Sequence, residues 1–276
     1  MKNTLYSSPM SSISITAAYA FFPLEEAQIV QLQEELRLFG MQREMRGLVL
    51  IAPEGINSTV CGTQAAIDDW KARLRKLKDD IIFKDSFADR LVFKRWSVKI
   101  KKEIVTIKQP QIQPKGKHRH ISPQQWNDML KQEDVMVIDT RNAYEVALGK
   151  FKNAIDPGTR HFQEFPDFVK QANIPKEKKV MLYCTGGIRC EKAIHAMEEQ
   201  GYQNVFQLDG GILAYLEQFP HQQFEGECFV FDRRVAVDQE LAPSKIYKLC
   251  RGCGDPSDQG EKCKRCMQLV KAGSSK

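Results

Sequence analysis

Cys184 begins a glycine-rich stretch whose residue types suit nucleophilic chemistry, Cys184-Thr-Gly-Gly-Ile-Arg189. The stretch follows the apolar segment 180–183, which predicts a buried strand, and precedes a predicted helix over 191–200. The two adjacent glycines let the backbone curl so that several N–H groups point at one atom, and the helix adds the positive end of its dipole. A thiol there is expected to have a lowered pKa and to be a thiolate near neutral pH. The sequence therefore predicts a reactive nucleophile at Cys184.

The residues after Cys184 complete a predicted catalytic site. Arg189 supplies a fixed positive charge and a planar fork of donors that suits an oxyanion. Cys190 is expected to be a resolving thiol or a second reactive sulfur, or else a small residue that packs at the start of the helix. We expect Cys184, Arg189 and Cys190 to be catalytic. The residues between the first two are expected to contact the substrate: Thr185, Gly186, Gly187 and Ile188.

A second group of cysteines near the end of the chain has the spacing of a metal site. Cys250-x2-Cys253 is followed after nine residues by Cys263-x2-Cys266. Two such pairs resemble zinc-ribbon knuckles, and four thiolates make a closed tetrahedral structural site. We expect zinc ahead of an iron–sulfur cluster. The alternative is a tail of reactive thiols.

Three apolar runs predict the elements that position Cys184. Segments 135–138, 180–183 and 205–208 are continuously apolar, as in parallel strands covered on both faces, and the first two precede helical patterns. They predict a doubly wound α/β domain over 121–235. Ligands of such sheets bind just beyond the carboxyl ends of the strands, which is where Cys184 stands. A small Cys-rich tail over 236–276 follows this domain.

The first hundred residues predict a β-α-β-β-α-β order, the ferredoxin-like split βαβ. We expect a strand at 14–21, a helix at 24–39 ended by Gly40 as its C′ residue, strands at 47–52 and 58–61, a helix capped by Thr63 and a last strand that begins at Leu91. Both helices are expected on one sheet face, with the other free to bind a partner. The predicted bounds are 1–108 for this α+β domain and 109–120 for a basic linker.

The charge of the chain is unevenly distributed. Lys plus Arg number 41 against 35 acidic residues, a net charge of +6. Ten bases and one acid fall between 90 and 120, and eight bases and three acids between 245 and 276, so the remainder is net acidic. This pattern favours a polyanion-binding protein. The alternative is a solvated basic strand face and a soluble tail.

The sequence predicts neither a membrane span nor export. No stretch approaches the ~18 uninterrupted apolar residues of a spanning helix. The apolar run 15–22 could be taken for a signal peptide. However, Lys2 is the only basic residue before it and several serines interrupt the approach, so a buried first strand explains the run better. We expect a cytoplasmic protein without a membrane partner. In a reducing compartment its eight cysteines are expected to be metal ligands or thiols.

Further segments around the Cys184 loop carry a resemblance to a known family. They are Asp139-Thr-Arg141, Glu145, Gly149-Lys-Phe-Lys-Asn-Ala-Ile155 and Leu208-Asp-Gly-Gly-Ile212. Together with the loop they resemble rhodanese domains, in which the loop cysteine takes a sulfane sulfur and becomes a persulfide. The resemblance implies that Asp139 and Arg141 belong to the substrate-binding set. Related dual-specificity phosphatases have a loop one residue longer, sized for phosphate, so this loop suits sulfur. Cys190 stands where ordinary rhodaneses have a small residue.

Longer runs match one family more closely. They are Ala52-Pro-Glu-Gly-Ile-Asn57, Lys99-Ile-Lys-Lys-Glu-Ile-Val-Thr106, Asp139-Thr-Arg-Asn142 with Tyr144-Glu-Val146, and Tyr183-Cys-Thr-Gly-Gly-Ile-Arg-Cys-Glu-Lys192. Over residues 14–250 the chain resembles the bacterial rhodanese-domain tRNA uridine hydroxylases. This implies an acylphosphatase-like N-domain, a rhodanese domain and a Cys-bearing tail, and oxygen-dependent formation of 5-hydroxyuridine at the wobble position of tRNA. The chain departs at Ser58, where glycine is usual, and at Lys150, where threonine is common.

The basic segment before the predicted rhodanese domain is consistent with an RNA substrate. Its side chains alternate partly along a predicted strand and are expected to contact tRNA phosphates. Trp96 among them is expected either to stack on a base or to belong to the core. The basic residues expected to bind tRNA are Lys94, Arg95, Lys99, Lys101 and Lys102.

The resemblance implies molecular oxygen as co-substrate, whereas the sequence identifies no redox cofactor. It has no Gly-x-Gly-x-x-Gly fingerprint, and none of its five His is followed two positions later by Asp or Glu. We therefore expect a persulfide or sulfenate on Cys184 to relay oxidising equivalents or to add transiently to the uracil ring. The alternatives are a sulfurtransferase that takes sulfur from thiosulfate or a sulfur-donor protein, and a binding module with an incidental thiol.

Overall fold

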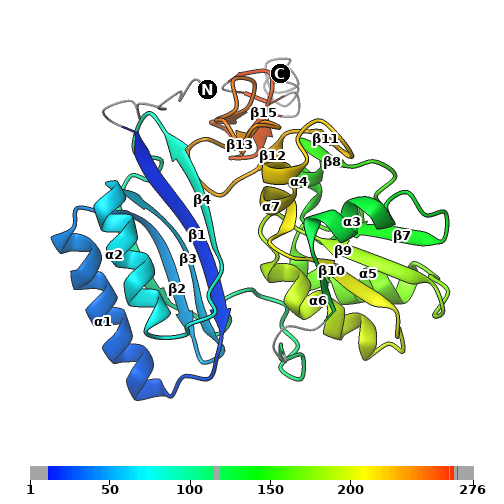
Figure 1. Ribbon diagram of the computed structural model, residues 1–276, viewed down its shortest axis with the longest axis horizontal. Coiled ribbons are helices and arrows are strands. Elements are labelled where there is room, and N and C mark those ends of the chain that lie inside the picture. Colours follow the sequence, from blue (N-terminus) through cyan, green and yellow to red (C-terminus); the bar gives the residue numbers. More distant parts are fainter. Residues whose placement is uncertain (1–11, 115–118, 261, 264–265, 267–276) are drawn as a thin grey trace, which may run out of the picture. The chain divides into compact units, whose positions relative to one another are not determined.

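The structure, a computed structural model, describes residues 12–114, 119–260, 262, 263 and 266 (Figure 1). The chain divides into two compact units, 1–104 and 105–276. None of the helices in the described ranges combines the length and the apolar character that a bilayer crossing needs.

The first unit is a five-stranded sheet with two helices. In chain order its elements are β1 (Ile13–Phe21), α1 (Glu26–Gln42), β2 (Arg46–Ala52), β3 (Gly55–Gly62), α2 (Gln64–Arg75), β4 (Phe83–Ala88) and β5 (Trp96–Ile100). The strand order is β4-β1-β3-β2-β5, so the first four strands form the predicted ferredoxin-like sheet. The last strand was predicted from Leu91, which is wrong. β4 fills that position, and β5 is a further strand that pairs in parallel with β2 at the sheet edge.

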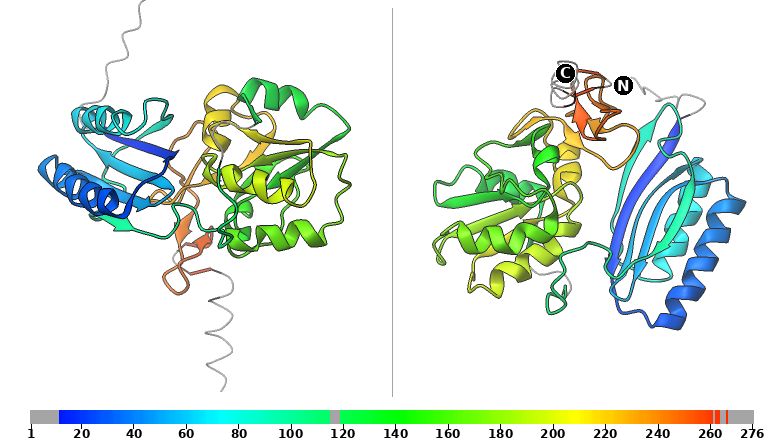
Figure 2. Two further views of the ribbon diagram at one scale, coloured as in Figure 1. Left: turned by 90° about the horizontal axis from the view of Figure 1, so that it is seen from below. Right: turned by 180° about the vertical axis from the view of Figure 1, so that it is seen from behind.

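The core of the first unit lies between the sheet and its helices. Both α1 and α2 cover the same face of the sheet, as Figure 2 shows from two sides. Thr63 caps α2 as predicted, because its hydroxyl accepts from the Ala66 N–H at 3.2 Å. The opposite face is partly covered, where Val92 of the β4–β5 connection packs with Ile15 and Cys61. The expectation of a wholly free second face is therefore corrected, and Cys61 is a plain core residue.

Gly40 lies inside α1 and does not end it, contrary to the sequence prediction. A Cβ at this position would lie 2.1 Å from Cε2 of Trp96, so only glycine lets the indole pack against the helix. The Trp96 Nε1–H donates to the Leu36 carbonyl at 3.2 Å, and the ring meets Trp70 edge to face at 5.6 Å. Trp96 is thus half-buried against the core, which favours packing over base stacking.

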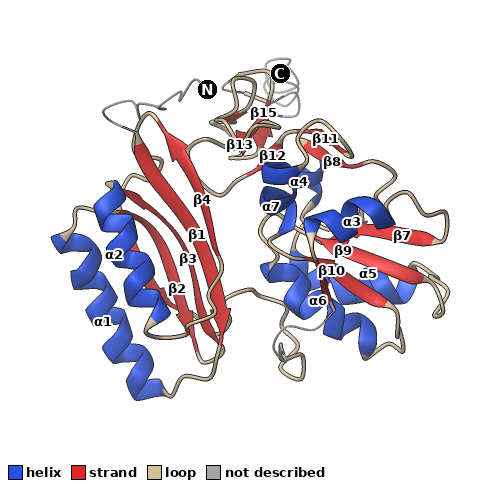
Figure 3. Cartoon of the chain, in the orientation of Figure 1, coloured by secondary structure: helices blue, strands red, loops and turns tan. Residues whose placement is uncertain are grey.

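The second unit is a doubly wound α/β domain with small β additions. Its sheet has the order β6-β10-β9-β7, and the neighbouring strands pair in parallel (Figure 3). Its elements are β6 (His120–Ile121), α3 (Pro123–Met129), β7 (Val135–Asp139), α4 (Ala143–Val146), β8 (Gly149–Phe151), a 3₁₀ turn (Phe162–Glu164), α5 (Phe165–Gln171), β9 (Lys179–Tyr183), α6 (Ile188–Glu198), β10 (Val205–Leu208), α7 (Gly211–Gln218), β11 (Phe224–Gly226), β12 (Cys228–Phe229), β13 (Ala236–Val237), β14 (Lys248–Leu249) and β15 (Pro256–Ser257).

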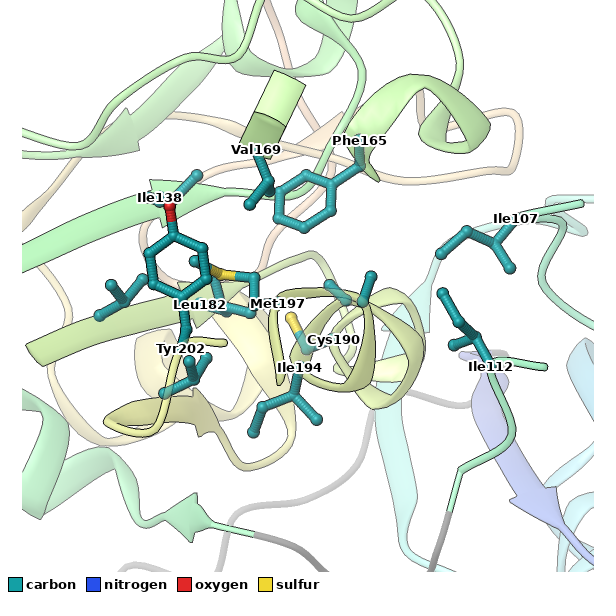
Figure 4. Close-up of a cluster of buried hydrophobic side chains, with 14 of the residues drawn as sticks. Ile107, Ile112, Ile138, Phe165, Val169, Leu182, Cys190, Ile194, Met197 and Tyr202 are labelled. Carbon is teal, nitrogen blue, oxygen red and sulfur yellow. The ribbon is translucent and has the colours of Figure 1, made fainter. Parts of the chain in front are cut away.

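Side chains of β9 explain why this strand is apolar throughout. Val180 and Leu182 enter the cluster formed with α5 and α6, whereas Met181 and Tyr183 enter the cluster formed with α3 and α7. Both faces of the strand are therefore buried, as the continuous apolar run predicts. Figure 4 shows the first of these clusters, with Cys190 among its apolar side chains.

The segment predicted as a linker is partly built into the second unit. Ile112 is buried in the α5–α6 cluster together with Ile107, so the segment contributes to the core of this unit. The predicted span 109–120 also ends inside β6, and residues 115–118 lie outside the described residues.

Candidate active site and cysteine cluster

Cys184 lies directly after β9, in a loop that folds back around its sulfur. The Gly187 N–H donates to Cys184 Sγ at 3.1 Å, and the Arg189 N–H also donates to it. Gly187 has φ +98° and begins α6, a backbone conformation that favours glycine. The chain turn and the helix start thus aim N–H groups at one sulfur atom, as the Gly-Gly pair predicts.

The surroundings of Cys184 favour the thiolate. Burial alone raises the pKa of this thiol. The Cys190 thiol that donates a hydrogen bond to it, the Arg189 charge and the two N–H groups together have the larger effect and lower the pKa to about 5. Cys184 is therefore a thiolate at neutral pH, which is the state of a nucleophile.

Arg189 is held by Glu145, a residue that sequence reasoning noted only for its resemblance to rhodaneses. Nη1 and Nη2 of Arg189 donate to the two carboxylate oxygens of Glu145 at 2.6 and 2.7 Å. The Asn142 N–H also donates to Glu145, in a capping box at the start of α4. Two of the five guanidinium N–H donors are thus occupied by Glu145. Arg189 acts on Cys184 through its charge and its N–H.

Asp139 and Arg141, which are expected to bind substrate, are fully buried and form a hydrogen-bonded ion pair with each other. Arg141 Nε and Nη2 donate to the Asp139 carboxylate, the latter at 2.6 Å, and Nη2 also donates to the Gly149 carbonyl at 2.7 Å. Neither side chain is exposed. They tie the end of β7 to β8, so we assign them a positioning role without direct contact to the substrate.

Cys190 lies in the first turn of α6, in contact with Cys184. Its sulfur is fully buried and lies 3.6 Å from the Thr140 hydroxyl. Burial, the hydrogen bond with Cys184 and the negative charge of Cys184 raise the pKa of Cys190 well above its usual value. The two sulfurs therefore meet in opposite protonation states, which the sequence could not show.

The segment after β11 lies near the loop, which sequence reasoning missed. The Thr185 hydroxyl donates to the Phe229 carbonyl at 3.4 Å, and the exposed Phe231 ring lies 5.8 Å from Arg189 Cζ. Burial raises the pKa of Cys228 to about 12, with Cys184 among the charges that act on it. No local pattern in 228–231 signals this, since the contacts cross more than forty positions.

Little of the loop reaches the surface. Cys184 is 1% exposed and Arg189 7%, whereas Gly186 and Ile188 are half-buried. Of the four residues between Cys184 and Arg189, only Gly186 and Ile188 are more than slightly exposed.

The four tail cysteines come together as a cluster. The sulfurs of Cys250, Cys253, Cys263 and Cys266 all lie within 4.8 Å of one another, and Cys250 is buried. A Cβ on Gly252 would lie 3.0 Å from Cys266 Sγ, so a side chain at this position of the turn would crowd the Cys266 sulfur. The Cys263 N–H donates to Cys250 Sγ at 3.3 Å. This donor set fits a metal ion that takes four thiolates.

The basic residues expected to bind tRNA are all exposed but do not all belong to a strand. Only Lys99 lies within β5, at the sheet edge. Lys94 and Arg95 precede β5 and Lys101 and Lys102 follow it, so the expected alternation along one strand is corrected. The structure gathers them along and beyond one edge strand.

Comparison with known proteins gives matches over each part of the chain. The UPF0176 acylphosphatase-like domain matches residues 13–104, the rhodanese-like domain 122–218 and the rhodanese C-terminal family 225–275. Among solved structures, the rhodanese-like domain of an Anabaena protein is 17% identical and covers 40% of this chain and 80% of its own, with a TM-score of 0.34.

Curated relatives match nearly the whole chain. A Bdellovibrio bacteriovorus protein is 45% identical over 91% of this chain and 73% of its own length, and a Prochlorococcus marinus protein is 43% identical over 88% and 81%. Both are named tRNA uridine(34) hydroxylase. With its acylphosphatase-like and rhodanese-like parts and the thiolate loop in the second, the chain belongs to the tRNA uridine(34) hydroxylase family.

Proposed function

We propose that this protein hydroxylates the wobble uridine of tRNA to 5-hydroxyuridine, with Cys184 as its reactive group. The observation that carries the proposal is the thiolate at the carboxyl end of β9, held by two N–H groups and the Arg189 charge. This arrangement occurs in a chain that belongs to the tRNA uridine(34) hydroxylase family. We place the reaction in the cytoplasm, where tRNA is modified.

In this proposal Cys184 acts as a nucleophile on the base. The thiolate adds to C6 of the uracil ring, which makes C5 electron-rich and reactive toward an oxidant. Molecular oxygen is the co-substrate that supplies the new hydroxyl oxygen, and a small dithiol reductant supplies the two electrons and two protons that convert its second oxygen atom to water. Loss of the C5 proton with departure of the Cys184 thiolate from C6 then restores the ring. Because Cys184 is 1% exposed, the loop near Gly186 and Ile188 must admit the base.

The exposed basic residues along β5 are proposed to hold the tRNA backbone. Lys94, Arg95, Lys99, Lys101 and Lys102 offer positive charges that are spread along an edge strand and its flanks. Contacts from such side chains to phosphates position a nucleic acid without reading its sequence.

The four tail cysteines are proposed to hold a structural zinc ion. Their sulfurs converge from two Cys-x2-Cys pairs, and a site with four protein ligands is closed to substrate. The ion would stabilise the tail around the β14–β15 hairpin and take no part in catalysis.

The test is the content of modified nucleosides in tRNA from cells that lack this protein. Complementation with the natural chain is expected to restore 5-hydroxyuridine, whereas complementation with Cys184→Ala is expected to give none. The control Cys61→Ala, which changes a buried cysteine of the first unit, is expected to restore it fully. Undiminished 5-hydroxyuridine with Cys184→Ala would overturn the proposal. Loss of thiolated uridines in its place would establish a sulfurtransferase.

A sulfurtransferase is the second candidate, because four residues separate Cys184 from Arg189 and the loop N–H groups converge on one sulfur. Its sulfur would come from thiosulfate or a sulfur-donor protein. A thiosulfate assay measures this activity directly and needs no tRNA.

A further inference from the structure

Cys184 and Cys190 form a pair of thiols in which one has lost its proton and the other keeps it. The Cys190 S–H donates to the Cys184 sulfur, and both side chains are buried. A thiolate next to a protonated thiol is the arrangement in which one sulfur attacks a donor and the other follows. The fold places both cysteines, since Cys184 directly follows β9 and Cys190 lies in the first turn of α6.

Two contacts surround Cys190 beside Cys184. The Thr140 hydroxyl lies 3.6 Å from Cys190 Sγ and itself donates to the Tyr183 carbonyl at 3.0 Å. The Cys190 N–H donates to the Gly187 carbonyl at 3.0 Å, which closes the loop over the sulfur. The two sulfurs are already in hydrogen-bond contact, which is the proximity that a disulfide between them requires.

We propose that Cys190 is the resolving thiol of Cys184, so that a persulfide formed on Cys184 is converted within the chain to a Cys184–Cys190 disulfide with release of hydrosulfide. This is an activity additional to the tRNA reaction and does not depend on it. A rhodanese with a single loop cysteine needs an external acceptor to remove the sulfur of its persulfide.

The steps balance with a sulfane donor such as thiosulfate. The Cys184 thiolate attacks the outer sulfur of thiosulfate, forms a persulfide and releases sulfite. Cys190 Sγ then attacks Cys184 Sγ, and the bond from Cys184 to the outer sulfur breaks, with its electron pair leaving on the outer sulfur. The Cys190 proton goes to that sulfur, which departs as hydrosulfide. The two cysteines are oxidised by two electrons and the sulfane sulfur is reduced to sulfide. A small dithiol reductant returns the pair for a second turnover.

The experiment is a single turnover of the reduced full-length protein with thiosulfate and no added thiol. Sulfite, hydrosulfide and the mass of the loop are measured in the same sample. Trypsin cuts after Lys179, Arg189 and Lys192, so Cys184 and Cys190 fall in separate peptides that only a disulfide joins. We expect about one hydrosulfide per chain and the two peptides linked.

Variants separate the two steps. Cys190→Ser is expected to release sulfite as the natural chain does, to keep the extra sulfur on the Cys184 peptide and to release no hydrosulfide. Normal sulfite release shows that the Cys190→Ser loop is folded. Cys184→Ser is expected to release neither product, and Cys61→Ser, a matched change of a buried cysteine in the first unit, to behave as the natural chain.

Three results would overturn the proposal. The first is a natural chain that keeps its persulfide and releases no hydrosulfide. The second is release of hydrosulfide with a disulfide that involves Cys228 or a tail cysteine. The third is undiminished release from Cys190→Ser. None of them bears on 5-hydroxyuridine in tRNA, so this proposal and the proposed function fail separately.

Discussion

Glu145 binds both terminal nitrogens of Arg189 next to the Cys184 loop, at 2.6 and 2.7 Å, and is itself fully buried. Two of the five N–H donors of the loop arginine therefore bind the protein itself. Its charge still favours the Cys184 thiolate, while the carboxylate balances it within a site that has little access to water. The pair connects α4 with α6, so it also fixes the end of the loop that begins at Cys184.

Removal of the carboxylate leaves a buried charge without its partner. Glu145→Gln is expected to lower the free energy of unfolding by about 3–5 kcal/mol, the usual cost of breaking a buried ion pair from one side. Urea unfolding measures it. Asp128→Asn, which breaks an exposed pair with Lys131 in the same unit, is expected to leave the midpoint unchanged. Equal stability of the two variants would contradict the buried pair.

The lowered pKa of Cys184 predicts how stability depends on pH. The folded state holds this thiol deprotonated down to about pH 5, whereas the unfolded thiol binds its proton below about pH 8.5. The unfolded state thus binds more protons between these values, and the free energy of unfolding rises with pH there. The advantage is lost as pH falls through the folded pKa.

The measurement is the difference in free energy of unfolding between the natural chain and Cys184→Ser, followed from acid to alkaline pH. It is expected to grow from about pH 5 to about pH 8.5. A flat difference for Cys184→Ser would mean an ordinary thiol.

The contact between Gly40 and Trp96 predicts a strong effect from one added methyl group. Gly40→Ala places its Cβ 2.1 Å from the indole and is expected to destabilise the first unit by about 1–3 kcal/mol through overpacking. Gly62→Ala is the control, because its nearest neighbour lies at 3.5 Å. Combining Gly40→Ala with Trp96→Leu is expected to cost less than the sum of the single changes.

The tail cluster predicts about one zinc ion per chain. Elemental analysis of the purified protein is expected to find zinc. The zinc content of Cys263→Ser is expected to be well below that of Cys61→Ser. Gly252→Ala is also expected to reduce it, because the added carbon lies 3.0 Å from the Cys266 sulfur. Iron in place of zinc, or equal metal in all these variants, would refute the assignment.

The basic edge strand predicts a salt-dependent interaction with tRNA. Lys99→Glu is expected to weaken binding and to reduce the slope of log affinity against log salt by ~1. Lys170→Glu makes the same change in net charge at an exposed lysine of α5 and is expected to have little effect. The thiosulfate reaction is expected to be indifferent to both. Equal effects on tRNA binding would point to net charge alone.

Much of the loop was predictable because its determinants are adjacent in sequence. A strand, a cysteine, two glycines and a helix start need only a few residues to specify a turn whose N–H groups converge on Cys184. The pairs that hold this turn are different, since Glu145 meets Arg189 and Thr140 meets Cys190 across more than forty positions. Spacing along the chain carries no sign of such contacts.

The errors in the first unit have the same origin. Gly40 follows a helical pattern and has the residue type of a helix end, but the distant Trp96 decides its role. The β4–β5 connection contains the apolar residues Leu91, Val92 and Phe93, which suggest a strand. Val92 is instead buried against the sheet face. Of these three residues only Val92 is fully buried, so an apolar run does not by itself fix either the burial or the backbone conformation of a segment.

The position of β5 at the end of the sheet has a consequence for how copies of this protein behave at high concentration. A terminal strand carries unpaired backbone groups that can recruit a strand from another molecule. Here Lys99 lies within that strand and Lys101 and Lys102 follow it, all exposed. Repulsion between the lysines of two copies opposes pairing of their edge strands. The residues that we propose to bind RNA therefore also disfavour aggregation.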